Sequence, residues 1–505
     1  MLIRLLHAMF GVLATLTGVA AAHLVAALTV PAASPVLVVG STVIDLTPTP
    51  VKEWAIRSFG TADKPILIGS VMLGVLVLAA IAGIVAARRI TAGLLMIVGL
   101  AMLAGVLALL RPSAGPLDLL PSLVAALVGA VALWWLHRLE ESAPGAGVEG
   151  AAGPTRRGVL LAAGGLAAAA AVLGSAGRFI SAYRLKGTDI DLPTATGTTP
   201  PLPDGLDGKI KGISPFRTPT ADFYRVDTRL SLPIVDAETW SLTIDGDVDQ
   251  EVTLTLADLY ELEVIERDIT LTCVSNDVGG PYVGAARWLG VRLTDVLDLA
   301  GIDNTSADQI LSTDVDGMTI STPLATATDG RDAMIVFGMN GEPLPRENGF
   351  PVRMVVPGLY GFVSACKWIT KMTLTTYDDQ QAYWTERDWA TEAPIKISSR
   401  IDTPKPLSDS SPGRIAIGGV AWAQGVGIKG VEVRIDGGPW QPATLGPDAG
   451  DDYWRQWFLE WDAAPGQHFL ACRATNNDGD VQTPVRATPF PEGSTGIQEI
   501  AVNVG

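Results

Sequence analysis

The 505-residue sequence has few residues of the types that build metal clusters, disulfide frameworks or hydrolytic nucleophile–base pairs. It contains three cysteines and four histidines, with no Cys-x-x-Cys or paired Cys/His spacing, which argues against a zinc site, an iron–sulfur cluster and a c-type haem. Positive charge is also scarce, because 36 lysines and arginines face 53 aspartates and glutamates for a net charge of −17. Without a basic stripe to neutralise phosphates, no nucleic-acid partner is expected.

Charge is nearly absent from five apolar stretches in the first 180 residues. They account for much of the 48% hydrophobic content and the mean hydropathy of +0.31. Each approaches the roughly 17–25 helical residues that cross a bilayer, and none keeps a polar face. The stretches are Leu5–Val30, Ile66–Ala86, Thr91–Leu110, Leu117–Leu136 and Gly158–Ala176. We therefore expect residues 1–180 to form a membrane region of five transmembrane helices, with lipid as a partner.

The basic residues near these stretches predict an orientation, because cytoplasmic loops are enriched in Lys and Arg. A cytoplasmic N-terminus places most of them inside and leaves the C-terminal part on the outer face of a bacterial plasma membrane. The inside set is Arg4, Arg88, Arg89, Arg138, Arg156 and Arg157, whereas Lys52, Arg57 and Lys64 in the first outer loop oppose the bias. The Arg156-Arg157 pair before an Ala/Gly-rich stretch is also typical of a twin-arginine export signal, and both interpretations give the same topology.

The remaining chain divides into three segments by composition and periodicity. Residues 181–222 are dense in Pro, Gly and Thr and are expected to be an irregular linker. Strand-like alternation with two short helical patterns, "LTLADLYEL" and "RLTDVLDLAGI", predicts a mixed α+β domain over residues 223–402. Several short period-two strands after residue 403, with an Asp-Gly turn in "IDGGPW", predict an all-β immunoglobulin-like sandwich over residues 403–505.

Cys273 ends an apolar run and precedes a polar, turn-rich segment in "LTCVSNDVGGPYVGAARW". A thiolate at such a strand end can act as a nucleophile or as a soft ligand for a transition metal. The nucleophile needs a histidine base, yet three histidines lie in the apolar half and His468 lies in the predicted sandwich. The residues alone therefore leave two interpretations of Cys273 open, a buried structural thiol and a metal ligand.

Two longer blocks resemble the sulfite-oxidase family of molybdopterin enzymes. Cys273–Ile302, "CVSNDVGGPYVGAARWLGVRLTDVLDLAGI", is similar to the family's core motif, in which one cysteine ligates molybdenum. Met339–Thr370, "MNGEPLPRENGFPVRMVVPGLYGFVSACKWIT", is similar to its Asn-Gly-x-x-Leu-Pro…His-Gly-Phe-Pro-x-Arg…Pro-Gly…Lys-Trp signature. The similarity extends over Phe223–Val504. It implies a molybdenum-molybdopterin cofactor and a C-terminal domain that pairs two chains as a homodimer.

The resemblance also implies roles for individual residues. Cys273 matches the metal ligand at the catalytic centre, where a soft thiolate binds beside the dithiolene sulfurs of the pterin. Arg353 and Lys367 match residues that hold the pterin's phosphate with fixed positive charge. The other matching cofactor contacts are Tyr224, Asp227, Thr228, Asn276, Asp314, Asn348 and Cys366.

The sequence departs from the family where sulfite would bind. The family's Arg-Asn-His triplet aligns with Val226-Asp227-Thr228, so the arginine of the sulfite clamp is a valine unless Arg225 takes its place. Asp277-Val278 stand where the family's Cys-x-x-Asn run continues with two arginines. Asn348 replaces the family's histidine, and no tyrosine matches the one expected near the metal. Since a dianion needs a positive cage, a neutral or less charged substrate is favoured.

These features predict an outward-facing, membrane-anchored oxidoreductase that transfers an oxygen atom in a two-electron step and exchanges electrons with an external protein. Its expected substrate is a small-molecule or protein sulfur oxide. Alternatives are a sulfoxide reductase, including methionine-sulfoxide reductase, and a non-catalytic membrane protein with an outer partner-binding domain. Cys366 and Cys472 are expected as buried free thiols rather than a disulfide. His23 and His137 are weak candidates for haem ligands, since no second pair of histidines completes a two-haem arrangement.

Overall fold

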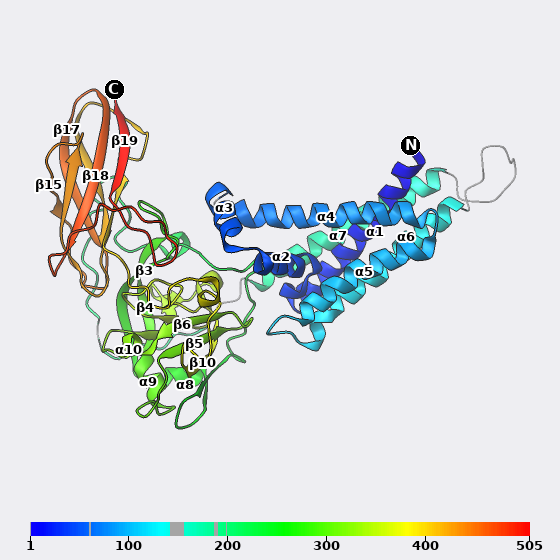
Figure 1. The fold of residues 1–505 in the computed structure, drawn as a ribbon, viewed down its shortest axis with the longest axis horizontal. Helices are drawn as coiled ribbons and strands as arrows, with labels where there is room; N and C mark the ends of the chain where they lie inside the picture. Colours follow the sequence, from blue (N-terminus) through cyan, green and yellow to red (C-terminus); the bar gives the residue numbers. More distant parts are fainter. Residues whose placement is uncertain (1, 60–61, 142–155, 186–189, 198) are drawn as a thin grey trace. The chain divides into compact units, whose positions relative to one another are not determined.

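The computed structural model describes residues 2–59, 62–141, 156–185, 190–197 and 199–505 (Figure 1). The chain forms two compact units. The first comprises Met1–Gly187 together with Thr228–Ile234, and the second comprises Thr188–Asp227 together with Val235–Gly505. The chain therefore leaves the second unit after Asp227 and re-enters it at Val235.

The first unit is built from the apolar stretches, each of which is a helix as expected. Five of its helices are long and apolar enough to cross a membrane by length and composition. They are α1 (Leu2–Leu28), α4 (Asp63–Ala86), α5 (Ile90–Leu109), α6 (Leu120–Glu141) and α7 (Arg156–Arg184). Gly11 of α1 and Gly83 of α4 face each other, and a Cβ on either would collide with the opposite backbone. Such small residues let apolar helices approach closely.

Two further helices occupy the segment that the sequence analysis treated as a simple outer loop. They are α2 (Pro35–Leu46) and α3 (Thr49–Phe59). Pro35 begins α2 at a position where the missing backbone N–H costs nothing. With 12 residues, α2 is too short to cross a bilayer core that needs roughly 17–25.

The second unit contains a mixed domain of two sheets. The first sheet has the order β2-β1-β10-β5-β6, in which β1 and β10 are parallel. The second has the order β3-β4-β7-β8, with β9 paired to β7. The strands are β1 (Ser241–Gly246), β2 (Val252–Thr255), β3 (Val264–Thr272), β4 (Val283–Arg292), β5 (Gln309–Asp314), β6 (Thr319–Pro323), β7 (Met334–Met339), β8 (Glu342–Pro343), β9 (Arg353–Val355) and β10 (Ile369–Thr375). The two predicted helical patterns form α8 (Leu256–Tyr260) and α9 (Leu293–Asp298), and α10 (Leu324–Ala327) adds a further turn.

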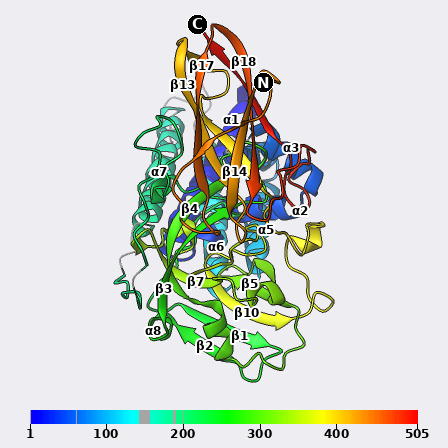
Figure 2. The same ribbon diagram turned by 90° about the vertical axis from the view of Figure 1, so that its left-hand side faces the viewer.

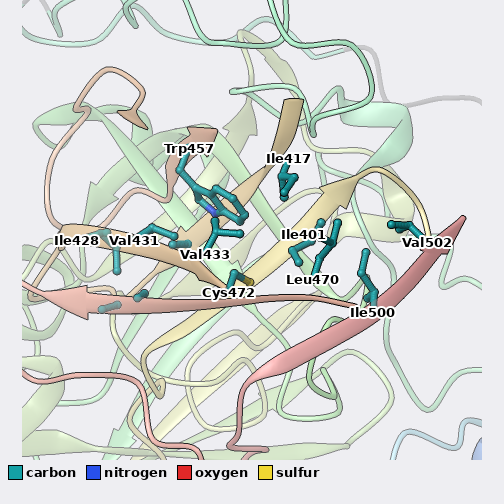
Figure 3. Close-up of a cluster of buried hydrophobic side chains, with 13 residues drawn as sticks. Ile401, Ile417, Ile428, Val431, Val433, Trp457, Leu470, Cys472, Ile500 and Val502 are labelled. Atoms are coloured by element: carbon teal, nitrogen blue, oxygen red, sulfur yellow. The ribbon is translucent and has the colours of Figure 1, made fainter. Parts of the chain in front are cut away.

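The C-terminal part consists of two sheets whose inner faces share one apolar core (Figure 2). One sheet contains β11 (Ser398–Thr403), β13 (Gly413–Trp422), β17 (Arg455–Ala463) and β16 (Thr444–Leu445). The other contains β12 (Asp409–Ser410), β19 (Gln498–Val504), β18 (Gly466–Asn476), β14 (Ile428–Ile435) and β15 (Gln441–Pro442). Trp457 and Ile417 lie opposite Val433, Leu470 and Cys472 in that core (Figure 3). The expected turn after β14 has positive φ at Asp436 and Gly437. The structure thus contains a β-sandwich, and its immunoglobulin-like character stays a prediction.

The sandwich and the mixed domain are joined by a second shared core. Phe216 from the irregular segment, Val283 and Ala285 of β4, and Trp422, Tyr453 and Trp454 of the sandwich are buried together. Trp454 and Tyr453 both donate hydrogen bonds to the carbonyl of Phe216, at 2.7 and 3.0 Å. The segment expected to be a linker is therefore irregular in backbone but is anchored to the unit at Leu202, Leu206 and Phe216.

Candidate cofactor and active site

Cys273 directly follows β3, whose last four residues are buried. Its backbone N–H donates to Tyr282 O at 3.0 Å, which continues the β3–β4 pairing by one residue. Its carbonyl then accepts from Asn276 N at 3.0 Å and closes a turn. The strand thus delivers the thiol to a fixed position, where its residue is 8% exposed.

Asn276 holds the loop that follows Cys273. Its Oδ1 accepts from Tyr282 N at 2.8 Å, and its carbonyl accepts from Ser494 Oγ at 2.6 Å. The sandwich therefore contributes a side chain to the conformation of this loop. The predicted contact of Asn276 with the cofactor stays a prediction, while the structure gives the residue a clear positioning role.

The thiol of Cys273 is in an environment that favours its neutral form in the absence of a metal. Burial raises its pKa, while the Ser275 N–H, 3.4 Å from Sγ, and the positive charge of Lys367 oppose the rise. Burial also raises the pKa of the Tyr360 hydroxyl to about 12, and the Cys273 charge adds to this rise. Cys273 would bind a metal as the thiolate, and the charge of the cation would favour loss of the thiol proton.

Arg353 is a buried cation at the start of β9. Its guanidinium donates to Asn348 O at 3.0 Å and to Ala365 O at 3.5 Å, and lies 5.4 Å from the ring of Trp288. Burial lowers its pKa to about 10 against the opposing effects of Tyr224 and Cys366. Among the described residues no carboxylate pairs with Arg353, so its charge is available to an anionic ligand.

Lys367 is bridged to Arg353 by backbone pairing and lies over the ring of Trp368 at 4.6 Å. Its Nζ donates to Asp227 Oδ2 at 2.9 Å and to Glu347 O at 3.1 Å. Burial lowers its pKa to about 8, and Asp227 opposes that decrease. Asp227 also accepts two hydrogen bonds from Arg225, at 2.7 and 3.2 Å. The arginine that could have replaced the missing sulfite clamp is therefore already engaged.

Asn348 and Gly349 form the wall between these two cations. Asn348 is 1% exposed, and its Oδ1 is buried without a hydrogen-bond partner. Gly349 has a φ of 115°, and a Cβ there would lie 3.0 Å from Arg353 Cβ and 3.2 Å from Lys367 Cβ. An unpaired buried acceptor and two largely buried cations are costly in a free protein. They fit a ligand that carries both hydrogen-bond donors and negative charge.

The other predicted site residues take different places. Tyr224 stacks on Phe223 at 5.2 Å, and burial raises the pKa of its hydroxyl, with Cys273 adding to the rise. Cys366 is buried as a free thiol, as are Cys273 and Cys472, which confirms the prediction that no disulfide forms. Asp314 Oδ1 accepts from the backbone N–H of Asp316 and Met318, at 2.9 and 3.0 Å, and so caps the β5–β6 turn. Thr228 falls in the helical unit.

Sequence analysis missed Tyr360 and Trp288. Tyr360 lies in the "PGLYGF" loop that the family signature covers. The electrostatic effect of Cys273 on Tyr360 depends on the placement of this loop, in which Gly361 N donates to Thr272 O across 89 positions of sequence, at 3.1 Å. Trp288 is the sixth residue of β4 and is completely buried. Its position under Arg353 follows only from the pairing of β4 with β7 and of β7 with β9.

Comparisons with known proteins match this arrangement. The family model described as oxidoreductase molybdopterin binding domain matches residues 229–384. The chain is 31% identical over 315 residues to the mitochondrial sulfite oxidase of Homo sapiens, covering 53% of this chain and 57% of that protein. It is 28% identical to the sulfite oxidase of Arabidopsis thaliana, covering 48% and 73%. The chain thus spans less than two thirds of the human relative.

A solved structure has a similar fold. The sulfane dehydrogenase SoxCD from Paracoccus pantotrophus matches 57% of this chain and 83% of its own with a TM-score of 0.50 at 22% identity. Together with the site, these matches define residues 229–384 as a molybdopterin-binding oxidoreductase domain. Over this domain the chain is similar to the sulfite-oxidase family of molybdopterin enzymes.

The described residues fit the cofactor of that family, molybdenum-molybdopterin. Cys273 offers one soft sulfur donor at a strand end. Arg353 and Lys367 offer buried positive charge for a phosphate, and Asn348 offers an amide oxygen that has no other partner. When bound, the metal centre supplies the redox chemistry, while the chain orients the cofactor and excludes water.

Proposed function

We propose that the chain is a membrane-anchored molybdopterin-dependent oxidoreductase that catalyses two-electron oxygen-atom transfer at an outward-facing site. One observation carries this proposal. Cys273, Arg353, Lys367 and the unpartnered Asn348 Oδ1 form a largely buried set that combines a sulfur ligand, two cations and a hydrogen-bond acceptor, which together suit a molybdopterin. Electrons would pass to or from an external protein, and a homodimer through the sandwich remains part of the proposal.

The membrane part of the proposal is supported by five helices of sufficient length and apolarity. The outward orientation is supported by the distribution of Arg and Lys around them. A protein without catalytic function would gain nothing from two nearly buried cations and an unpaired amide oxygen, because each lowers the stability of the fold.

Metal analysis of the purified full-length protein in detergent tests the proposal. We expect molybdenum at about one atom per chain in the wild type and none above background in Cys273→Ser. Cys472→Ser is a matched control, because Cys472 is equally buried and free but lies in the sandwich core. A molybdenum-free wild type would overturn the proposal, and equal loss in both variants would indicate misfolding instead.

A second candidate, reduction of a neutral sulfoxide, is favoured over sulfite oxidation by the charges beside the site. Val226 and Val278 stand where the family carries arginines, and Val226 is 40% exposed. Arg225 is held by Asp227, so its charge is partly neutralised. A dianion would be poorly held there. Assays of sulfite with an electron acceptor, and of sulfoxides with reduced viologen, separate the two directions.

A further inference from the structure

A cluster of aromatic rings lies close to the loop that carries Cys273. Trp389 is its centre, and its ring lies 5.5 Å from Phe362, 5.8 Å from Trp384 and 5.3 Å from Phe490. We call these four residues the aromatic platform. They come from three segments that are distant in sequence, so the fold alone brings them together.

Two of these segments are hydrogen-bonded to the loop of Cys273. Gly361, which precedes Phe362, donates its N–H to Thr272 O at 3.1 Å. Ser494, four residues after Phe490, donates to Asn276 O at 2.6 Å. The third segment is fixed to the second, because Ala390 N donates to Pro491 O at 3.2 Å. The platform is therefore anchored on both sides of Cys273.

The platform differs from the buried cores of the same unit. Phe362 is 8% exposed, whereas Trp384, Trp389 and Phe490 are only half-buried. Three of the four rings therefore keep part of their aromatic surface exposed, in segments held by hydrogen bonds on both sides of Cys273.

These features match one class of substrate. Sulfur bound to apolar carbon makes favourable contacts with aromatic rings, and half-exposed rings remove apolar substituents from water. The geometry points to the aromatic platform as the surface that binds the apolar substituent of a neutral sulfoxide. This inference rests on the proposed sulfoxide reduction. In that reaction, the sulfoxide takes two protons and two electrons, one from each of two viologen radical cations. Its sulfur–oxygen bond breaks, and the corresponding sulfide and one water molecule form.

Two substrates of different size test the inference on the molybdenum-loaded, full-length protein. Methyl p-tolyl sulfoxide has an aryl group to bind, and dimethyl sulfoxide has none. For Trp389→Ala we expect KM for the aryl sulfoxide to rise at least tenfold, kcat to change less than twofold and the parameters for dimethyl sulfoxide to stay within twofold. Trp389→Phe, which keeps a ring, should recover most of the loss. Trp440→Ala is the control, since Trp440 is a half-buried tryptophan packed against Arg434 and Arg473 of the sandwich.

Binding without turnover gives a second readout. Methyl p-tolyl sulfide should quench tryptophan fluorescence of the wild type and of Trp440→Ala, with at least tenfold weaker affinity for Trp389→Ala. Molybdenum content and circular dichroism must match in all variants. If neither sulfoxide is reduced but sulfide binding still depends on Trp389, sulfoxide reduction fails while the binding surface stands. If both sulfoxides are reduced and Trp389→Ala shows unchanged KM and binding, the inference is overturned.

Discussion

Lys367 Nζ lies 2.9 Å from Asp227 Oδ2, and the two side chains are only 11% and 5% exposed. Asp227 is also paired with Arg225, at 2.7 Å. One carboxylate therefore serves two cations, and with Arg353 beside Lys367 the site carries more positive than negative charge. A cofactor phosphate would complete this charge balance, because buried cations are stable only when paired.

Cofactor uptake should weaken as pH rises above 8. Burial lowers the pKa of Lys367 to about 8 in the free protein, so at higher pH the lysine must take up a proton before it can pair with the phosphate. Linkage then lowers the affinity by about tenfold for each pH unit above 8, until the higher pKa of the bound state is reached. The measurement is the amount of molybdopterin that the apo-protein binds at each pH between 7 and 10.

Replacement of Asp227 tests the cause of that pH dependence. Asp227 opposes the effect of burial on Lys367, so Asp227→Asn should lower the lysine pKa further. The decline in cofactor retention should then begin at lower pH than in the wild type. Asp245→Asn is a suitable control, because Asp245 pairs with the more exposed Lys371 in the same domain. A decline that is unchanged in Asp227→Asn would contradict this assignment.

Asn348→Leu should separate cofactor affinity from stability. The Oδ1 of Asn348 is buried without a partner, and its removal relieves a desolvation cost of about 1–3 kcal/mol that partly offsets any loss of packing. We expect the free energy of unfolding of the apo-protein to change by less than about 1 kcal/mol, while cofactor affinity falls at least tenfold. Urea unfolding and molybdenum content measure the two effects. A strongly destabilised apo-protein would show that the amide has a structural role.

Arg353→Lys should fail even though it keeps the charge. The guanidinium reaches the Asn348 and Ala365 carbonyls from different nitrogen atoms, a fork that an ammonium group cannot reproduce. We expect loss of most bound molybdenum and a lower melting temperature, because a buried carbonyl loses its donor. Arg346→Lys is a comparison, since Arg346 donates to Val235 O at 2.8 Å beside Phe350 in the same region. If Arg353→Lys binds as much molybdenum as the wild type, the forked guanidinium is not required for cofactor binding.

The sequence allowed the centre of this site to be predicted but not its surroundings. The strand-like apolar run before Cys273 predicted that this residue ends a strand, and the resemblance to the sulfite-oxidase family implied the roles of Arg353 and Lys367. The aromatic platform could not be predicted, because Phe362, Trp389 and Phe490 meet only after the two domains pack.

Two other features could not be predicted from the local sequence, the hydrogen bonds of Asp314 and the helices α2 and α3. The carboxylate of Asp314 accepts the N–H groups of the turn that follows it, a positioning role that the sequence did not indicate, and its contact with the cofactor stays a prediction. Nothing in the composition of residues 31–65 distinguished the short helices α2 and α3 from a loop, since α3 is polar and α2 is only 12 residues long.

The mixed domain and the sandwich should unfold together. Trp454 is 2% exposed within the core they share, and its indole N–H donates to Phe216 O at 2.7 Å. Trp454→Ala removes a buried aromatic ring and should cost about 3–5 kcal/mol. Calorimetry of the wild type should show one unfolding transition for these two domains. Trp454→Ala should lower the temperature of that single transition without splitting it. A second transition that keeps its wild-type temperature would show that the domains are independent.

The proposed orientation predicts which surface residues can be labelled from outside the cell. All three native cysteines are buried and free, so a membrane-impermeant maleimide should react weakly with the wild type. Lys429 is exposed on the sandwich, and Arg88 is exposed between α4 and α5. If the catalytic part is extracytoplasmic, Lys429→Cys should be labelled in intact spheroplasts, whereas Arg88→Cys should react only after permeabilisation. The opposite pattern would invert the topology, and labelling of both residues in intact spheroplasts would argue against a membrane-spanning arrangement.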